Sequence, residues 1–181
     1  MKLFKKGNKG FTLIELLIVI GIMAILAVAA LIAINPGEAN NKARDVERLK
    51  EVADLQKVME QWMQESTATT AFTSISTANA GSPLCSGSGW LSAAGLNVCA
   101  YANTLAVDPV NKAAQAHQNS TAATTGTVAY EVTYDGAQHY RICTHLQSQA
   151  NRAMLTSDGG IHADAYEISN VTAGNGCTVI D

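Results

Sequence analysis

The chain opens with a short polar leader and continues into an almost unbroken run of apolar side chains. The run extends from Phe11 to Ile34, and a single charged residue, Glu15, interrupts it. As an α-helix rising about 1.5 Å per residue, it reaches roughly 36 Å, enough to cross a hydrocarbon core of about 30 Å. The pattern therefore predicts a membrane-spanning helix over residues 11–34.

A second helical pattern follows a break at Asn35-Pro36-Gly37, where proline and glycine are typical of a turn. Charged and apolar residues then recur at helical spacing, which predicts an amphipathic helix within residues 35–65. Its apolar stripe drifts round the helix and contains Ala39, Ala43, Val46, Leu49, Val52, Ala53, Leu55, Met59, Trp62 and Met63. Because this stripe is wider than a coiled-coil seam, we expect it to pack against a sheet. Arg48 lies opposite the first part of the stripe, where it is expected to pair with Glu51.

Alternating residues in the C-terminal half predict a small antiparallel sheet. The strand patterns, with the turn between the first two, occupy Val128–Tyr134, Asp135-Gly136, Tyr140–Thr144, Ala165–Ser169 and Cys177–Ile180. Residues 66–83 are rich in Ser, Thr and Ala, so we expect a loosely packed connector there. The whole pattern predicts an α+β fold. A long N-terminal helix, with an apolar half and an amphipathic half, packs on the sheet of a globular domain over residues 66–181.

Charge divides the chain into a basic leader and an acidic remainder. The leader carries Lys2, Lys5, Lys6 and Lys9. Because positive flanks stay in the cytoplasm, we expect everything after Ile34 to lie outside the inner membrane. The formal charge of the chain is −3, and removing the +4 of the leader leaves −7. An acidic surface argues against a general affinity for nucleic acid.

Two common kinds of N-terminal segment fit this pattern poorly. A cleaved secretory signal has an apolar region of about 7–15 residues, which is shorter than the run seen here. A plain membrane anchor explains the length and the lysines but not Glu15. A charged side chain in a bilayer costs about 3 kcal/mol or more, so an intramembrane carboxylate is a functional hypothesis by default.

The residues around Glu15 make the interpretation specific. The segment Lys9-Gly10-Phe11-Thr12-Leu13-Ile14-Glu15-Leu16 resembles the prepilin signal of type IV pilins and pseudopilins. The resemblance covers about residues 5–34, and beyond them the chain agrees with the pilin-like fold in layout only. It implies that a prepilin peptidase removes the leader, residues 1–10, by cutting between Gly10 and Phe11. It also implies that Phe11 is then N-methylated.

Cleavage would create an α-amine at Phe11, one helical turn from Glu15. The two groups could pair within one helix. The resemblance implies instead that Glu15 neutralises the Phe11 amine of a neighbouring subunit in a filament. A third possibility is that Glu15 reaches the lipid headgroups from near the end of its helix. The chain departs from many type IV pilins in one respect, because its first proline, Pro36, follows the apolar segment instead of interrupting it.

Four cysteines follow the membrane segment: Cys85, Cys99, Cys143 and Cys177. An even number on the oxidising side of a membrane indicates two disulfides, with three possible connectivities. Proximity in the sequence favours Cys85–Cys99 and Cys143–Cys177.

The sequence indicates neither a catalytic site nor a cofactor. It contains none of the common nucleophile, zinc-protease or phosphate-loop motifs, so we do not expect an enzyme. His139, Cys143 and His145 share a strand face, but a disulfide at Cys143 would exclude a metal there. Asp108-Pro109 faintly resembles a loop near which major pseudopilins bind calcium, a secondary hypothesis.

These observations predict a structural subunit of a type IV pilus filament, serving adhesion, motility or DNA uptake. It would be a single-pass protein of the bacterial inner membrane before assembly, and a filament subunit at the cell surface or in the periplasm afterwards. Its partners would be other copies of the chain, the prepilin peptidase and methyltransferase, and the assembly machinery. The alternatives are a pseudopilin of a type II secretion system and a membrane-anchored binding module that never polymerises.

Overall fold

The computed structural model describes residues 10–171 and Cys177. The leader before Gly10, and the candidate strand Cys177–Ile180 apart from its first residue, lie outside the described residues. The chain forms two compact units, Met1–Gly37 and Glu38–Asp181, and each is described by itself.

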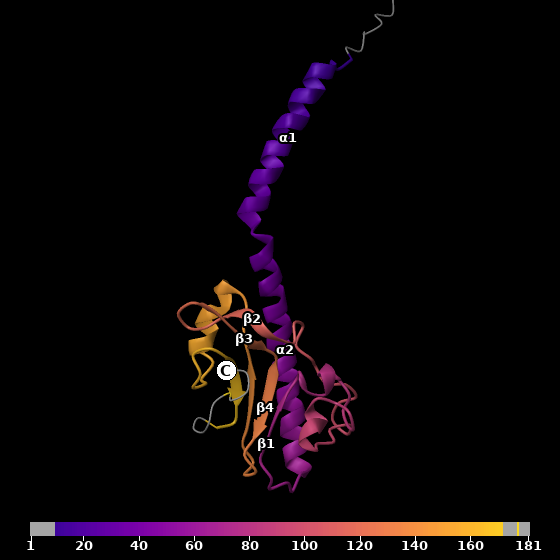
Figure 1. Ribbon diagram of the computed structural model, residues 1–181, viewed down its shortest axis with the longest axis vertical. Helices are drawn as coiled ribbons and strands as arrows, with labels where there is room; N and C mark the ends of the chain where they lie inside the picture. Colours follow the sequence, from indigo (N-terminus) through magenta and orange to yellow (C-terminus); the bar gives the residue numbers. More distant parts are fainter. Residues whose placement is uncertain (1–9, 172–176, 178–181) are drawn as a thin grey trace, which may run out of the picture. The chain divides into compact units, whose positions relative to one another are not determined.

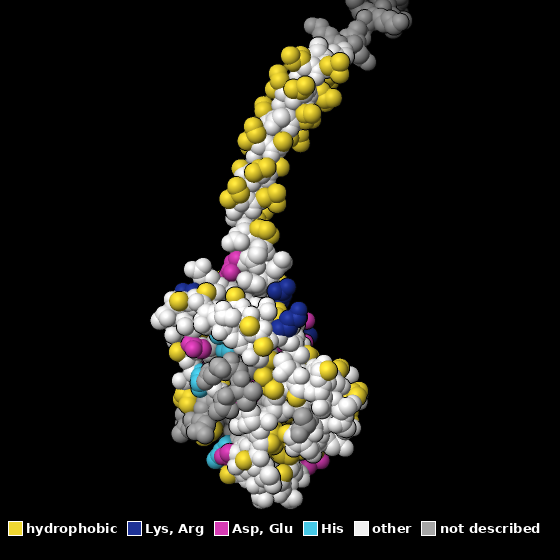
Figure 2. All heavy atoms as spheres, viewed as in Figure 1, with side chains coloured by type: hydrophobic (Ala, Val, Ile, Leu, Met, Phe, Trp, Pro, Cys, Tyr) yellow, Lys and Arg dark blue, Asp and Glu magenta, His cyan; other side chains and the backbone are white. Residues whose placement is uncertain are grey.

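The first unit contains α1, Leu13–Ile34. By length and composition, the described residues hold one helix able to cross a membrane, and α1 is its apolar part. None of the α1 residues is buried, and hydrophobic side chains cover its surface in Figure 2. Asn35, the capping residue that follows the helix, adopts a left-handed conformation with φ of 45°. Asparagine tolerates this conformation better than most residues do, so it suits a helix end.

The second helix, α2, runs from Pro36 to Glu65. Proline is favourable at the first helical position because its missing N–H has no partner there in any helix. The C-terminal part of the predicted stripe is buried: Val52, Leu55, Met59 and Trp62, together with Val58. The N-terminal part of the stripe was predicted wrongly.

In that N-terminal part, apolar Val46 is 61% exposed, whereas Asp45 and Arg48 are fully buried. Arg48 does not lie on a solvated face, and its ionic partners are Asp45 and Asp108, not Glu51. Mutual pairing makes the burial of these charges possible.

A four-stranded antiparallel sheet packs along α2 (Figure 1). Its strand order is β1-β4-β5-β6, with bounds Phe72–Ile75, Tyr130–Tyr134, Tyr140–Thr144 and Tyr166–Ser169. The predicted hairpin is therefore present as β4 and β5, paired from Tyr130↔Thr144 to Tyr134↔Tyr140. The prediction of a loose connector was wrong for its middle, because β1 pairs with β4 there.

A two-stranded sheet of β2, Lys112–Gln118, and β3, Ala123–Val128, was not predicted. Its turn is held by Asn119, whose side chain accepts hydrogen bonds from the backbone N–H of Thr121 and of Ala122. Three short 3₁₀ helices complete the described structure: η1 at Ala78–Gly81, η2 at Leu91–Ala94 and η3 at Gln149–Thr156.

The hydrophobic core lies between α2 and the inner face of the larger sheet. Trp62 meets Tyr134 edge to face, with ring centroids 5.2 Å apart. The hydroxyls of Tyr130 and Tyr140 donate hydrogen bonds to Glu51 and Glu60 of α2. Large aromatic side chains thus supply apolar contact while their polar ends are paired. The fold is α+β, with a long N-terminal helical region and antiparallel sheets.

Candidate functional site

The junction between Gly10 and Phe11 lies ahead of α1 and is exposed. Phe11 is 91% exposed, and neither residue belongs to a helix or strand. A Cβ built on Gly10 would meet no heavy atom within 4 Å. Among the described residues, nothing therefore requires glycine at position 10.

Thr12 and Glu15 form a reciprocal cap on the first turn of α1. The hydroxyl of Thr12 accepts a hydrogen bond from the Glu15 backbone N–H at 3.2 Å. In return, Oε2 of Glu15 accepts from the Thr12 N–H at 2.8 Å and from its hydroxyl at 2.9 Å. This capping box satisfies donors that a helix otherwise leaves unpaired. The sequence analysis missed it, although a threonine followed three residues later by glutamate signals it.

Glu15 is the one charge on a helix whose large apolar side chains are all about half exposed or more. Both bonds from Thr12 reach Oε2, and among the described residues Oε1 has no hydrogen-bond partner. The capping role therefore leaves one carboxylate oxygen available to a second partner. Pairing with the amine of Phe11, in the same copy or a neighbouring one, stays a prediction.

The four cysteines form two disulfides, Cys85–Cys99 and Cys143–Cys177. This is the pairing that proximity in the sequence favours. The first disulfide closes part of the segment between β1 and β2. The second ties β5 to Cys177, next to the buried side chains of Ala129 and Ala165.

A buried ionic cluster joins α2 to two distant loops. Arg48 donates from Nε to Asp108 at 2.7 Å, from Nη1 to Asp45 at 2.8 Å and from Nη2 to Gln147 at 3.0 Å. Burial lowers the pKa of Arg48, but the hydrogen bonds and charges of Asp108 and Asp45 reverse this effect and raise it. Asp45 also accepts from the backbone N–H groups of Gln147 and Ser148, at 2.9 and 2.8 Å.

The Asp-Pro motif suggested a calcium ion near Asp108, but in this cluster Arg48 is the ionic partner of Asp108. Its Oδ1 accepts from the backbone N–H groups of Val110 and Asn111 and from Arg48. Its Oδ2 accepts from Arg48 as well. A guanidinium already balances the charge of Asp108, so the loop is a structural anchor.

The residues considered for metal binding lie apart or are already bonded. His139 is exposed and pairs with Asp135 at 2.6 Å, whereas His145 is buried beyond β5. The Sγ atoms of Cys143 and Cys177 lie within 4.8 Å of a carboxylate oxygen of Glu167. Both sulfurs belong to the disulfide, however, and the Glu167 carboxylate already accepts from the Ile161 N–H and pairs with Arg141.

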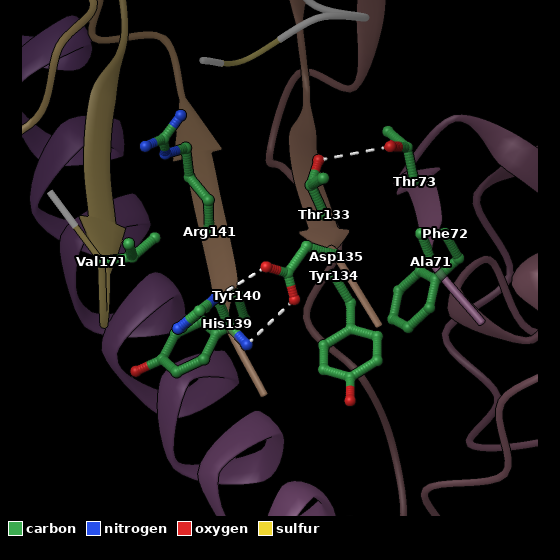
Figure 3. Close-up of a pocket in the computed structure, with 10 residues that line it drawn as sticks. All are labelled: Ala71, Phe72, Thr73, Thr133, Tyr134, Asp135, His139, Tyr140, Arg141 and Val171. Atoms are coloured by element: carbon green, nitrogen blue, oxygen red, sulfur yellow. Dashed lines mark hydrogen bonds and ion pairs between the residues drawn. The ribbon is translucent and has the colours of Figure 1, made fainter. Parts of the chain in front are cut away.

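A cavity of about 490 Å³ lies at the end of the larger sheet (Figure 3). Its lining includes Phe72, Tyr134, Asp135, His139 and Arg141. The Asp135 carboxylate is engaged by the His139 ring and by the N–H of Ala137. The hydroxyls of the lining bond to groups other than this His–Asp pair: those of Thr73 and Thr133 to each other, that of Tyr134 to Ala68 and that of Tyr140 to Glu60. The described lining therefore shows no nucleophile bonded to the histidine, as a catalytic triad requires.

Comparison with known proteins supports the N-terminal motif alone. A family model for the prokaryotic N-terminal methylation motif matches residues 5–31. No curated protein and no solved structure matched the chain. The matched segment contains Gly10, Phe11, Thr12 and Glu15 and extends through most of α1. The chain thus carries the N-terminal methylation signal of type IV pilins and pseudopilins, followed by a long apolar helix.

Proposed function

We propose that this chain is a structural subunit of a type IV pilus filament. One observation carries the proposal: an apolar helix of 22 residues, none of them buried, begins at the methylation motif. Apolar surface of this extent is unfavourable in water by roughly 25 cal/mol for each Å² exposed. The helix must therefore be covered by lipid before assembly and by other copies of the helix afterwards.

Processing would precede assembly. The prepilin peptidase would cut between Gly10 and Phe11 on the cytoplasmic side, and a methyltransferase would modify the new amine of Phe11. The exposure of this junction, outside any helix, supports access by both activities. The motif is that of structural pilin-type proteins, so we propose no enzymatic activity for the chain.

Glu15 would set the register between subunits. An ammonium and a carboxylate buried among apolar helices each need a partner of opposite charge. A subunit would dock at the depth where its Glu15 meets the Phe11 amine of a neighbouring copy. The available Oε1 supports this role, because capping by Thr12 already satisfies Oε2.

Unit Glu38–Asp181 would lie on the outer side of the inner membrane and then on the filament surface. Its two disulfides suit an oxidising compartment. The assembly machinery in the inner membrane would be a further partner. A pseudopilin of a type II secretion system would share every feature named here, whereas a non-polymerising anchor would have no use for Glu15.

Two substitutions separate charge pairing from helix capping. Glu15→Gln keeps the size of the side chain and an oxygen that accepts from Thr12, but it removes the charge. Thr12→Val keeps the charge and removes the hydroxyl of the cap. Each variant is expressed as the sole copy of the chain in cells that lack the wild type. Intact mass of membrane-purified protein reports processing, and shearing reports external fibres.

We expect both variants to begin at N-methylated Phe11. Thr12→Val should form fibres, whereas Glu15→Gln should accumulate in the membrane without fibres. Normal fibres from Glu15→Gln would contradict the pairing role. A wild-type chain that retains Met1 would overturn the processing step. Processed wild-type protein that never leaves the membrane would favour the anchor, and short fibres confined to the periplasm would favour the pseudopilin.

A further inference from the structure

Two buried histidines stack face to face where β2 meets the segment after β5. The ring centroids of His117 and His145 are 3.7 Å apart, and their planes differ by 17°. His117 is 3% exposed and His145 is 1% exposed. Parallel rings direct their nitrogen lone pairs side by side instead of toward one point, which does not suit joint ligation of a metal ion.

Each of the two rings donates from Nδ1 to a backbone carbonyl. Nδ1 of His117 lies 3.2 Å from the carbonyl oxygen of Gln118, and Nδ1 of His145 lies 2.7 Å from that of Thr127. A carbonyl oxygen only accepts, so each Nδ1 carries a proton, and a ring that is neutral keeps its lone pair on Nε2. Nε2 of His145 is buried without a hydrogen-bond partner among the described residues. A second proton on this ring would create a buried, unpaired N–H.

Charged groups face the pair from several elements. Arg48 of α2 opposes protonation of His145, while Asp108 favours it. Asp164 favours protonation of His117. A cavity of about 340 Å³ borders the pair, and both rings, Asp164 and His162 line it. Burial is nevertheless the largest effect for both rings. It lowers the pKa of His117, and with the neighbouring His117 it lowers the pKa of His145 to about 4.

The stacked pair lies on the contact between the β2–β3 hairpin and residues 145–148. The backbone N–H of Gln118 donates to the carbonyl of Leu146 at 2.7 Å. The Gln118 side chain donates to the carbonyl of Gln147 at 3.2 Å, and the Gln147 side chain donates to that of Ala116 at 2.9 Å. Gln147 also belongs to the ionic cluster of Arg48. Separation of the two rings would therefore lift β2 and disturb this anchor of α2.

We propose that the His117–His145 stack is an acid-sensitive latch, which holds the β2–β3 hairpin against residues 145–148 at neutral pH and releases it in acid. Protonation of both rings would place two like charges 3.7 Å apart in a buried site. Opening the hairpin relieves this repulsion and gives the ring nitrogens access to water. The surface of the subunit would then change with the acidity of its surroundings.

The size of the response follows from proton linkage. Burial and the neighbouring His117 lower the native pKa of His145 to about 4, whereas an unperturbed histidine has a pKa of about 6.5. Because the opened form binds the proton more tightly, closure is favoured fully above pH 6.5 and loses that advantage as the pH falls toward 4. Protonation of His145 alone should therefore raise the equilibrium constant for opening roughly fiftyfold between pH 7 and pH 4.5.

Hydrogen exchange tests the latch in the full mature chain, purified in detergent micelles. Mass spectrometry would follow peptides from the hairpin, residues 112–128, and from residues 145–148, after correction for the intrinsic exchange rate. In wild type, we expect their protection to fall by tens of fold between pH 7 and pH 4.5. Peptides from β4 and β5 should stay protected.

Two variants identify the responsible group. His145→Phe keeps an aromatic ring in the stack and removes the group whose protonation gives the expected response, so most of the acid response should disappear. His139→Gln removes an exposed histidine at the β4–β5 turn and should respond as wild type does. An equal response in His145→Phe would overturn the latch, and so would a wild-type hairpin that stays protected at pH 4.5.

A direct readout covers the case in which His145→Phe fails to fold. NMR titration of the histidine Cε1–H signals in wild type should show one ring with a pKa well below 6.5. If both buried histidines titrate near 6.5, the latch is overturned. These readouts use the unassembled chain, so they do not depend on whether it forms filaments.

Discussion

Arg48 provides the sharpest test of what stabilises unit Glu38–Asp181. Its guanidinium is fully buried and lies between two carboxylates, those of Asp45 and Asp108. Arg48→Met keeps much of the apolar volume of the side chain but removes the charge. Two carboxylates would then remain buried without a counter-charge, although each keeps hydrogen bonds from backbone N–H groups.

The expected cost is large. Removing one partner of a buried ion pair typically destabilises a protein by about 3–5 kcal/mol, because the charge left behind is uncompensated. Arg48 has two such partners and also donates to Gln147, so we expect a value in that range. Adding Asp108→Asn to Arg48→Met removes one of the two unpaired carboxylate charges. The double variant should therefore lose less stability than Arg48→Met alone.

Urea denaturation of the mature chain in detergent micelles provides the measurement. Urea is uncharged, so it does not screen ion pairs. The two tryptophans of the chain, Trp62 and Trp90, both lie in the core, and their fluorescence reports its unfolding. Arg44→Met is the matched control, because Arg44 is exposed on the same helix and should change stability by no more than about 0.5 kcal/mol. A loss below about 1 kcal/mol in Arg48→Met, or an equal loss in Arg44→Met, would refute the reasoning.

Three further predictions use the same unit. Burial raises the pKa of Glu51 in the folded protein, so the stability contributed by its protonated form is lost as the pH rises through that pKa. Glu51→Gln can still accept a hydrogen bond from the Tyr130 hydroxyl, so it should raise the urea midpoint at pH 7 and not at pH 4. Each disulfide can be removed by replacing its two cysteines with serine. The loss of stability should be about 4 kcal/mol for Cys143–Cys177 and about 3 kcal/mol for Cys85–Cys99, because Cys143–Cys177 closes the longer loop. The urea midpoints of the two variants show which loss is larger. A chain without residues 1–34 should be folded and monomeric by circular dichroism and light scattering, and unaided fibres would show that α1 is not the assembly element.

Features encoded by neighbouring residues could be predicted from the sequence. The apolar run, the lysines before it and the break at Pro36 are local patterns, and they placed α1 to within two residues at its start. The β4–β5 hairpin was predicted because its strands alternate and are joined by a short turn containing Gly136. That glycine has a φ of 82°, and a Cβ there would collide with the carbonyl oxygen of Thr69. The Thr12–Glu15 cap was equally local and could have been predicted.

Tertiary structure alone decided which polar residues are buried. Arg48 carries no local sign of burial, since its second carboxylate, Asp108, lies 60 residues further along the chain. Strand β1 lies in a Ser, Thr and Ala-rich segment and forms because β4 offers it a partner. His117 and His145 likewise meet only through folding. Local sequence determines the backbone preferences and apolar faces of single elements, whereas the partner of a buried charge or an edge strand depends on contacts that the folded chain alone creates.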